Sequence, residues 1–157
     1  MNRRQRVQVV EKLQRHLGAM LGRRIALLGL AFKPGTDDIR DAPAVEIAEL
    51  LLEIGASVRT HDPVVRSVPG LPELVIEDDP YDAAARADAV VLVTEWPEYQ
   101  VMDLDRLRAT MKGDLFVDAR NVFAPATLRA AGLRPVSFGR LDARSAVERS
   151  ASPVAIS

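Results

Sequence analysis

Two basic side chains, Lys33 and Arg40, stand seven residues apart in a connecting segment at residues 29–43. The segment also contains two glycines and two prolines, which restrict the course of the backbone. An apolar run at residues 24–28 precedes it and an amphipathic stretch follows it, so the segment joins a buried strand to a helix. Open α/β sheets bind ligands at such connections, and paired cations favour an anion such as a phosphate or pyrophosphate.

Arg120 adds a third cation shortly after a predicted strand at residues 115–117. Because the carboxyl ends of parallel strands share one edge of a sheet, we expect Lys33 and Arg120 to face one crevice, as a diphosphate requires. Each cation also has a simpler interpretation. Lys33 could be a solvated surface lysine, Arg40 could pair with Asp37, Asp38 or Asp41, and Arg120 could be buried against Asp118.

Other polar patterns in the chain are weaker. Asp37 and Asp38 resemble a metal-binding pair, but no further ligand cluster accompanies them, so we favour turn and cap roles and predict no metal. His61 with Asp62 could suggest acid–base chemistry, but Asp62-Pro63 is typical of a turn and a lone histidine at a strand end is usually structural. Asp62 also stands where a dinucleotide-binding unit has its ribose-binding acid. The stretch at residues 29–35 fits neither G-x-G-x-x-G nor a P-loop, so the sequence does not support a complete NAD site.

Alternating strands and helices must position these residues. The pattern predicts a helix over 3–20 with Arg6 and Lys12 outside its apolar stripe and Gly22 as its end, then five strands and four helices. The strands are expected at 24–29, 57–61, 89–93, 115–117 and 134–138, and the helices at 42–54, 80–86, 104–111 and 125–131. This order indicates an α/β fold, a Rossmann-like doubly wound parallel sheet in three layers (α/β/α) with about five strands, preceded by an N-terminal helix.

We expect the strand order 2-1-3-4-5, with Asp41 capping the helix at 42–54 and Pro43 in the first turn of that helix. Residues 63–79 are predicted to form a proline-rich loop. The predicted organisation is the end of a connecting helix at 1–22, an α/β domain at 23–140, and a tail at 141–157. The tail is rich in Ala, Ser and Arg and is expected to be partly disordered.

The composition excludes several classes of protein. A net charge of −1 and an aromatic content of 4% argue against binding to nucleic acid or to a membrane surface. There is no cysteine, so this chain can contain neither a disulfide nor a cysteine nucleophile. No apolar run approaches the length of a membrane-spanning helix, and the basic N-terminus lacks the apolar core of a signal peptide. A cytoplasmic location is the default expectation.

Several short motifs together resemble the C-terminal domain of the UDP-glucose/GDP-mannose dehydrogenase family over roughly residues 2–140. The motifs are Asn2 and Gln5 in the basic first helix, Phe32-Lys33 within 29–43, Asp62-Pro63, Thr94-Glu95-Trp96, Asp118-Ala119-Arg120-Asn121, and Gly139-Arg140. By this resemblance, Phe32, Lys33 and Arg120 would bind the nucleotide sugar. Arg40 would reach towards NAD held by another domain. A buried aromatic in the core is the rival interpretation for Phe32.

The resemblance implies the UDP-binding domain of an NAD-dependent enzyme that oxidises UDP-glucose to UDP-glucuronate. Such enzymes also have an N-terminal Rossmann domain, which binds most of the NAD, and a central helical connection, and they form homodimers or larger assemblies. The chain would then be an excised C-terminal domain, inactive alone and without catalytic residues of its own. The alternatives are the same domain of a UDP-N-acetylhexosamine or GDP-mannose dehydrogenase and a non-catalytic nucleotide-binding or dimerisation module. A flavodoxin-like FMN carrier is disfavoured because Lys33 and Arg40 replace a hydroxyl-rich phosphate loop.

Overall fold

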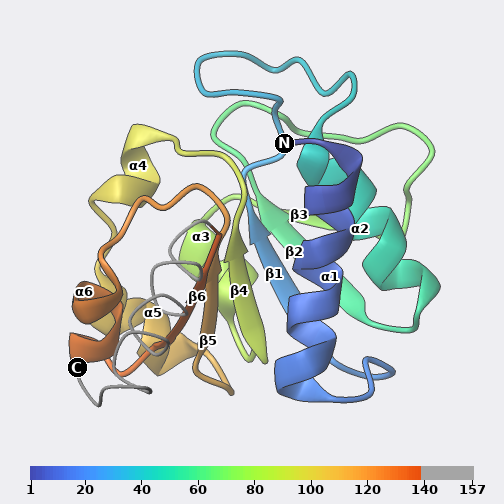
Figure 1. The fold of residues 1–157 in the computed structure, drawn as a ribbon. Helices are drawn as coiled ribbons and strands as arrows, with labels where there is room; N and C mark the ends of the chain where they lie inside the picture. Colours follow the sequence, from blue (N-terminus) through green and yellow to red (C-terminus); the bar gives the residue numbers. More distant parts are fainter. Residues whose placement is uncertain (139–157) are drawn as a thin grey trace, which may run out of the picture.

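The computed structural model describes residues 1–138, which form a parallel sheet with helices on both faces (Figure 1). The tail predicted at 141–157 and the Gly139-Arg140 motif lie outside the described residues. All strands run parallel in the order β3-β2-β1-β4-β5-β6. Their bounds are β1 (Arg24–Leu28), β2 (Ser57–His61), β3 (Val75–Glu77), β4 (Ala89–Leu92), β5 (Leu115–Asp118) and β6 (Arg134–Ser137).

The five predicted strands and their relative order are confirmed, and β3 is an addition. This three-residue strand pairs with β2 at the edge of the sheet, where the sequence analysis had placed only loop. Its residues are exposed or half-buried, so they lack the continuous apolar pattern of β1, β4 and β5. A short edge strand therefore leaves little periodic signal in the sequence.

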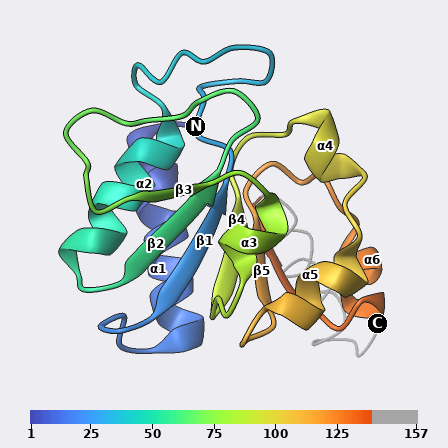
Figure 2. The ribbon, with the colours of Figure 1, turned by 180° about the vertical axis from the view of Figure 1, so that it is seen from behind.

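Helices α1 and α2 cover one face of the sheet, and α3 and α5 cover the other (Figures 1 and 2). The chain crosses from one face to the other between β3 and β4, as a doubly wound sheet requires. The helices are α1 (Arg3–Leu17), α2 (Pro43–Glu53), α3 (Pro80–Ala84), α4 (Pro97–Gln100), α5 (Leu104–Thr110) and α6 (Pro125–Ala130). The short helix α4 was not predicted.

The first helix is shorter than expected and buries two basic side chains. It ends at Leu17 with Gly18 as its C-cap, not at Gly22. Arg6 and Lys12, which were placed outside the apolar stripe, are 7% and 9% exposed. The Lys12 ammonium lies 5.1 Å from the centre of the Phe138 ring, and the Arg6 guanidinium is enclosed by ion pairs. Long basic side chains can cover apolar surface when their charged ends find partners, and a hydrophobicity pattern does not register this.

The helix α4 contributes a buried tyrosine to the core. The hydroxyl of Tyr99 donates a hydrogen bond to the backbone oxygen of His61 at 2.9 Å, and it also lies 2.8 Å from Nδ1 of the same histidine. Because the hydroxyl proton is engaged, Nδ1 of His61 must be the donor of the second bond. Burial lowers the pKa of His61 and raises that of Tyr99, so both groups are neutral. This pair is a structural link between β2 and α4.

Asp62 ties the ends of β1 and β2 together. It is fully buried, and its carboxylate accepts four backbone N–H groups. Oδ2 accepts from Leu30 at 2.7 Å and Ala31 at 3.0 Å, and Oδ1 accepts from Val64 and Val65 at 2.8 Å. The turn predicted for Asp62-Pro63 is therefore present, and the same carboxylate also fixes the start of the loop after β1.

Replacing Asp62 with Asn should reduce the free energy of unfolding by about 2–4 kcal/mol, because the amide group cannot accept two of the four N–H bonds. Urea unfolding followed by circular dichroism measures this loss. Asp78→Asn is a matched control because the Asp78 side chain is fully exposed, and it should change stability by no more than about 0.5 kcal/mol. Equal stability of the two variants would show that the Asp62 bonds contribute little.

Candidate functional site

The carboxyl ends of β1, β2, β4 and β5 carry loops at one edge of the sheet (Figure 1). The loops after β1 and β4 touch through Thr94, whose hydroxyl donates to the backbone oxygen of Ala31 at 2.9 Å. Gly29 permits this approach because a Cβ atom there would lie 2.5 Å from Cβ of Thr94, and its φ of +97° also disfavours other residues. The first glycine of the 29–43 segment therefore has a packing role.

The loop after β1 presents Phe32 and Lys33 to solvent. Its shape is held by bonds from the Phe32 N–H to the backbone oxygen of Asp38 at 2.8 Å and from the Asp38 N–H to Oγ1 of Thr36 at 3.1 Å. Phe32 is 51% exposed, so the interpretation as a core aromatic is wrong. Lys33 is exposed and makes no hydrogen bond or ion pair with any residue in the range 1–138. Its ammonium group is therefore available to a ligand.

Arg40 pairs with Asp38, one of its three predicted partners. Its Nε and Nη2 atoms each lie 3.0 Å from a carboxylate oxygen of Asp38, and its side chain is 90% exposed. The hydrogen bond from the Arg40 side chain is the main cause that lowers the pKa of Asp38 to about 2. Asp38 therefore stays ionised at neutral pH and orients the guanidinium group.

Asp41 does not cap the following helix, contrary to the sequence-based expectation. The N-cap of α2 is Ala42, which has no side-chain capping bond, whereas Pro43 begins the helix as predicted. Asp41 adopts a φ of +53°, and its Oδ1 and backbone oxygen accept hydrogen bonds from Arg6 at 3.2 and 2.9 Å. The fold places the buried Arg6 guanidinium group beside Asp41, so the carboxylate forms an ion pair with Arg6 where the local sequence pattern favours a helix cap.

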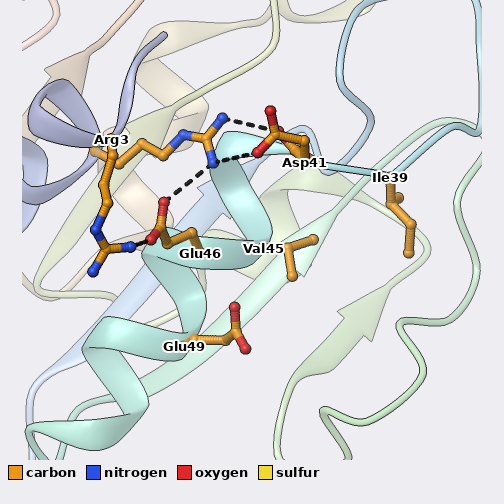
Figure 3. A pocket seen from close by; sticks show the side chains of 8 residues that line it. Arg3, Ile39, Asp41, Val45, Glu46 and Glu49 are labelled. Carbon is orange, nitrogen blue, oxygen red and sulfur yellow. Dashed lines mark hydrogen bonds and ion pairs between the residues drawn. The ribbon is translucent and has the colours of Figure 1, made fainter.

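A pocket of about 520 Å³ lies between α1, the end of the loop after β1, and the first turns of α2 (Figure 3). Its polar side chains pair mainly with each other: Glu46 accepts from both Arg3 and Arg6, and Arg6 also binds Asp41. None of the four residues predicted to bind a ligand lines this pocket. Its ion pairs join α1 to the loop that carries Lys33.

Arg120 pairs with Glu95, not with Asp118. Its Nε donates to Oε2 of Glu95, and both side chains are partly exposed. Asp118 is fully buried and accepts the backbone N–H groups of Arg120 at 3.1 Å and Phe123 at 2.8 Å. The alternative interpretation of Arg120 as a buried arginine paired with Asp118 is therefore wrong, because the Asp118 carboxylate binds backbone N–H groups in the turn after β5.

The structure places the predicted residues on two loops of one edge, without direct contacts between the loops' cations. Phe32, Lys33 and Arg40 follow β1, and Arg120 follows β5. Between these two loops lies the loop after β4, which carries Thr94 and Glu95. Thr94 contacts the loop after β1, and Glu95 contacts Arg120. Both residues belong to the Thr94-Glu95-Trp96 motif, but their position directly after a buried strand does not identify their partners.

Two further site types find no support in the described part of the chain. Among residues 1–138, no group of three or more His, Asp or Glu side chains is placed to hold a metal ion. The same residues include no helix with the length and apolarity needed to cross a membrane.

Comparisons with known proteins identify the family of this chain. Residues 26–125 match the UDP-binding domain of the UDP-glucose/GDP-mannose dehydrogenase family. The chain is 46% identical over 127 residues to UDP-glucose 6-dehydrogenase of Rhizobium meliloti (strain 1021), covering 80% of this chain and 29% of the relative.

Two solved structures share the fold. An NDP-N-acetyl-D-galactosaminuronic acid dehydrogenase from Methanosarcina mazei Go1 aligns with a TM-score of 0.74 at 30% identity over 87% of this chain and 28% of its own. A UDP-glucose dehydrogenase from Pyrobaculum islandicum aligns with a TM-score of 0.70 at 34% identity over 88% of this chain and 30% of its own. The chain thus spans less than a third of the length of these relatives. Its sequence match and its fold show that it belongs to the UDP-glucose/GDP-mannose dehydrogenase family, of which it represents the UDP-binding domain.

Proposed function

We propose that the strand edge carrying Phe32, Lys33 and Arg120 binds the UDP-sugar substrate of an NAD-dependent UDP-glucose 6-dehydrogenase. The observation that carries the proposal is a cation on each of two loops at the same sheet edge, Lys33 after β1 and Arg120 after β5, with the loop after β4 between them. Lys33 supplies a mobile point charge, and the planar guanidinium of Arg120 suits a bidentate contact with phosphate oxygens. Phe32 offers an exposed ring beside them for the sugar or the base.

In this proposal the domain contributes binding and positioning, not bond chemistry. The chain has no cysteine, so a step through a cysteine nucleophile would require residues outside it. Binding energy from the UDP portion would hold the sugar C6 alcohol in place against the catalytic groups of preceding domains. The complete enzyme would act as a homodimer or larger assembly.

The dinucleotide does not fit the β1–β2 unit of this chain. Asp62, at the position of a ribose-binding acid, is fully buried and already accepts four backbone N–H groups. The loop after β1 also lacks the glycine pattern that lets a pyrophosphate approach the backbone. We therefore assign NAD binding mainly to a preceding Rossmann domain, with the exposed Arg40 reaching towards it from this side.

The same edge would serve a dehydrogenase of another nucleotide sugar. The Methanosarcina mazei structure, named for an N-acetyl-galactosaminuronic acid, supports this second candidate through its TM-score of 0.74. Both candidates use the same diphosphate contacts and differ in the sugar. Oxidation of UDP-glucose compared with UDP-N-acetylhexosamines and GDP-mannose by the complete enzyme distinguishes them.

Substituting Lys33 with Ala should weaken UDP binding at least about tenfold, because one charge-assisted contact with phosphate is lost. The measurement is a titration of the isotope-labelled 157-residue chain with UDP, followed by backbone amide NMR. Lys112→Ala is the control, because Lys112 is an exposed lysine near the opposite end of β5. Equal affinity of the Lys33→Ala variant and the parent chain would contradict the assignment.

The chain alone should form no NADH from UDP-glucose and NAD, because the proposed catalytic groups belong to other domains. An absorbance assay at 340 nm with the purified chain tests this. Any substrate-dependent NADH formation would show that the chemistry resides in these 157 residues and would overturn the proposed division of roles.

Substituting Arg40 with Ala should raise the pKa of Asp38 from about 2 towards its ordinary value of 3.8, because the bond that favours the charged carboxylate is removed. Carboxyl carbon NMR across an acid titration reads this pKa directly. Lys33→Ala should raise it less, since Lys33 acts on Asp38 only through charge at a distance. An unchanged pKa in the Arg40→Ala variant would show that the pair is absent in solution.

A further inference from the structure

The ion pair between Glu95 and Arg120 joins two loops at the proposed binding edge. Nε of Arg120 donates to Oε2 of Glu95, while the backbone N–H of Arg120 is held by Oδ1 of Asp118 at 3.1 Å. The side chains of Arg120 and Glu95 are 39% and 31% exposed. The ion pair is thus accessible to solvent, and Arg120 is less free to move than an isolated surface arginine.

Both partners are anchored through their backbones. Oδ2 of Asp118 also accepts the Phe123 N–H at 2.8 Å, which closes the turn that carries Arg120. On the other loop, Nε2 of Gln100 donates to the backbone oxygen of Glu95 at 3.1 Å. The backbone of Glu95 therefore has a defined position from which its side chain reaches the guanidinium group.

The contact uses only one of the donor positions of Arg120. Within residues 1–138, no hydrogen bond is made by its two terminal nitrogens, Nη1 and Nη2. An arginine held through Nε keeps this fork in a fixed direction, and such a fork matches two oxygens of a phosphate group. Holding Nε therefore orders the side chain before the ligand arrives.

We infer that Glu95 is a positioning residue that directs the Arg120 guanidinium group towards the diphosphate of a bound nucleotide, an inference that rests on the proposed function. The negative charge of Glu95 opposes this benefit, but its repulsion of phosphate is screened because the pair is partly exposed. Ordering an arginine side chain on binding is costly, so pre-ordering favours the complex. The net effect is a gain in affinity.

The test compares variants of the 157-residue chain in NMR titrations with UDP and with uridine, which has no diphosphate. Glu95→Ala should weaken UDP binding about fivefold to tenfold and leave uridine binding unchanged. Glu95→Gln should restore most of the affinity, because its amide oxygen still accepts from Nε. Glu98→Ala, which changes an exposed acid in the same segment, should match the parent chain.

A double-mutant cycle separates positioning from a general effect on the fold. In an Arg120→Ala background, Glu95→Ala should cause no further loss of UDP affinity, because no guanidinium group remains to be positioned. An undiminished loss in that background would overturn the inference. So would a Glu95→Ala chain that binds UDP as tightly as the parent chain.

The resonance of the Arg120 Nε–H group gives a readout that needs no nucleotide. It should shift and exchange faster with water in the Glu95→Ala variant, and an unchanged resonance would overturn the inference. If the parent chain itself shows no UDP binding, the proposed function fails and the positioning role falls with it. Binding by the parent chain with an insensitive Glu95 refutes the positioning role alone.

Discussion

The carboxylate of Asp62 fixes the edge of the sheet on which the proposed site depends. Its four bonds to backbone N–H groups join the start of the loop after β1 to the turn after β2. Asp118 has a similar role after β5, and Thr94 ties the loop after β4 to Ala31. Buried polar side chains at the strand ends thus form hydrogen bonds with backbone groups of the loops. The exposed cations Lys33, Arg40 and Arg120 can face solvent because these other groups determine the loop shapes.

This arrangement differs physically from dinucleotide binding on the same strand order. A nucleotide-binding Rossmann unit brings a pyrophosphate to backbone N–H groups at a helix N-terminus through a short glycine-rich turn. Here fourteen residues separate β1 from α2, and ion pairs of Arg6 with Asp41 and Glu46 lie at the start of that helix. In the proposed site, recognition of an anion would therefore rely on side chains that project from the long loop. Flexible side chains bind an anion more weakly than a fixed set of backbone donors does, because they lose conformational entropy on binding, but they can adapt to its shape.

Much of the architecture could be predicted from the sequence, because the buried strands and the breaks between them leave strong local patterns. The continuous apolar runs of β1, β4 and β5 and the glycine after β1 are of this kind. Side-chain partners that are close in sequence could be anticipated, as for Arg40 and Asp38. Distant partners could not, since Arg6 contacts Asp41 and Arg120 contacts Glu95 across 35 and 25 positions of sequence. Asp41 illustrates the difficulty: the local pattern favours a helix cap, and only the fold places a buried arginine beside it. The edge strand β3 was missed for the opposite reason, because it is too short and exposed to produce a pattern.

The two arginines at the edge each have an acidic partner, which Lys33 lacks within residues 1–138. Each is bound by one carboxylate, Arg40 by Asp38 and Arg120 by Glu95, so each keeps a direction while part of its donor set stays available. An acid partner lowers the net positive charge of the arginine's surroundings, which reduces nonspecific attraction of anions. The geometry of the remaining N–H donors then discriminates between anions of different shape. Lys33 carries an uncommitted charge but must be ordered by whatever it binds. In the proposed site, selectivity would come from the oriented arginines, and Lys33 would add attraction once the ligand is in place. An edge built in this way holds a ligand from one side only, so tight binding requires a second surface opposite it.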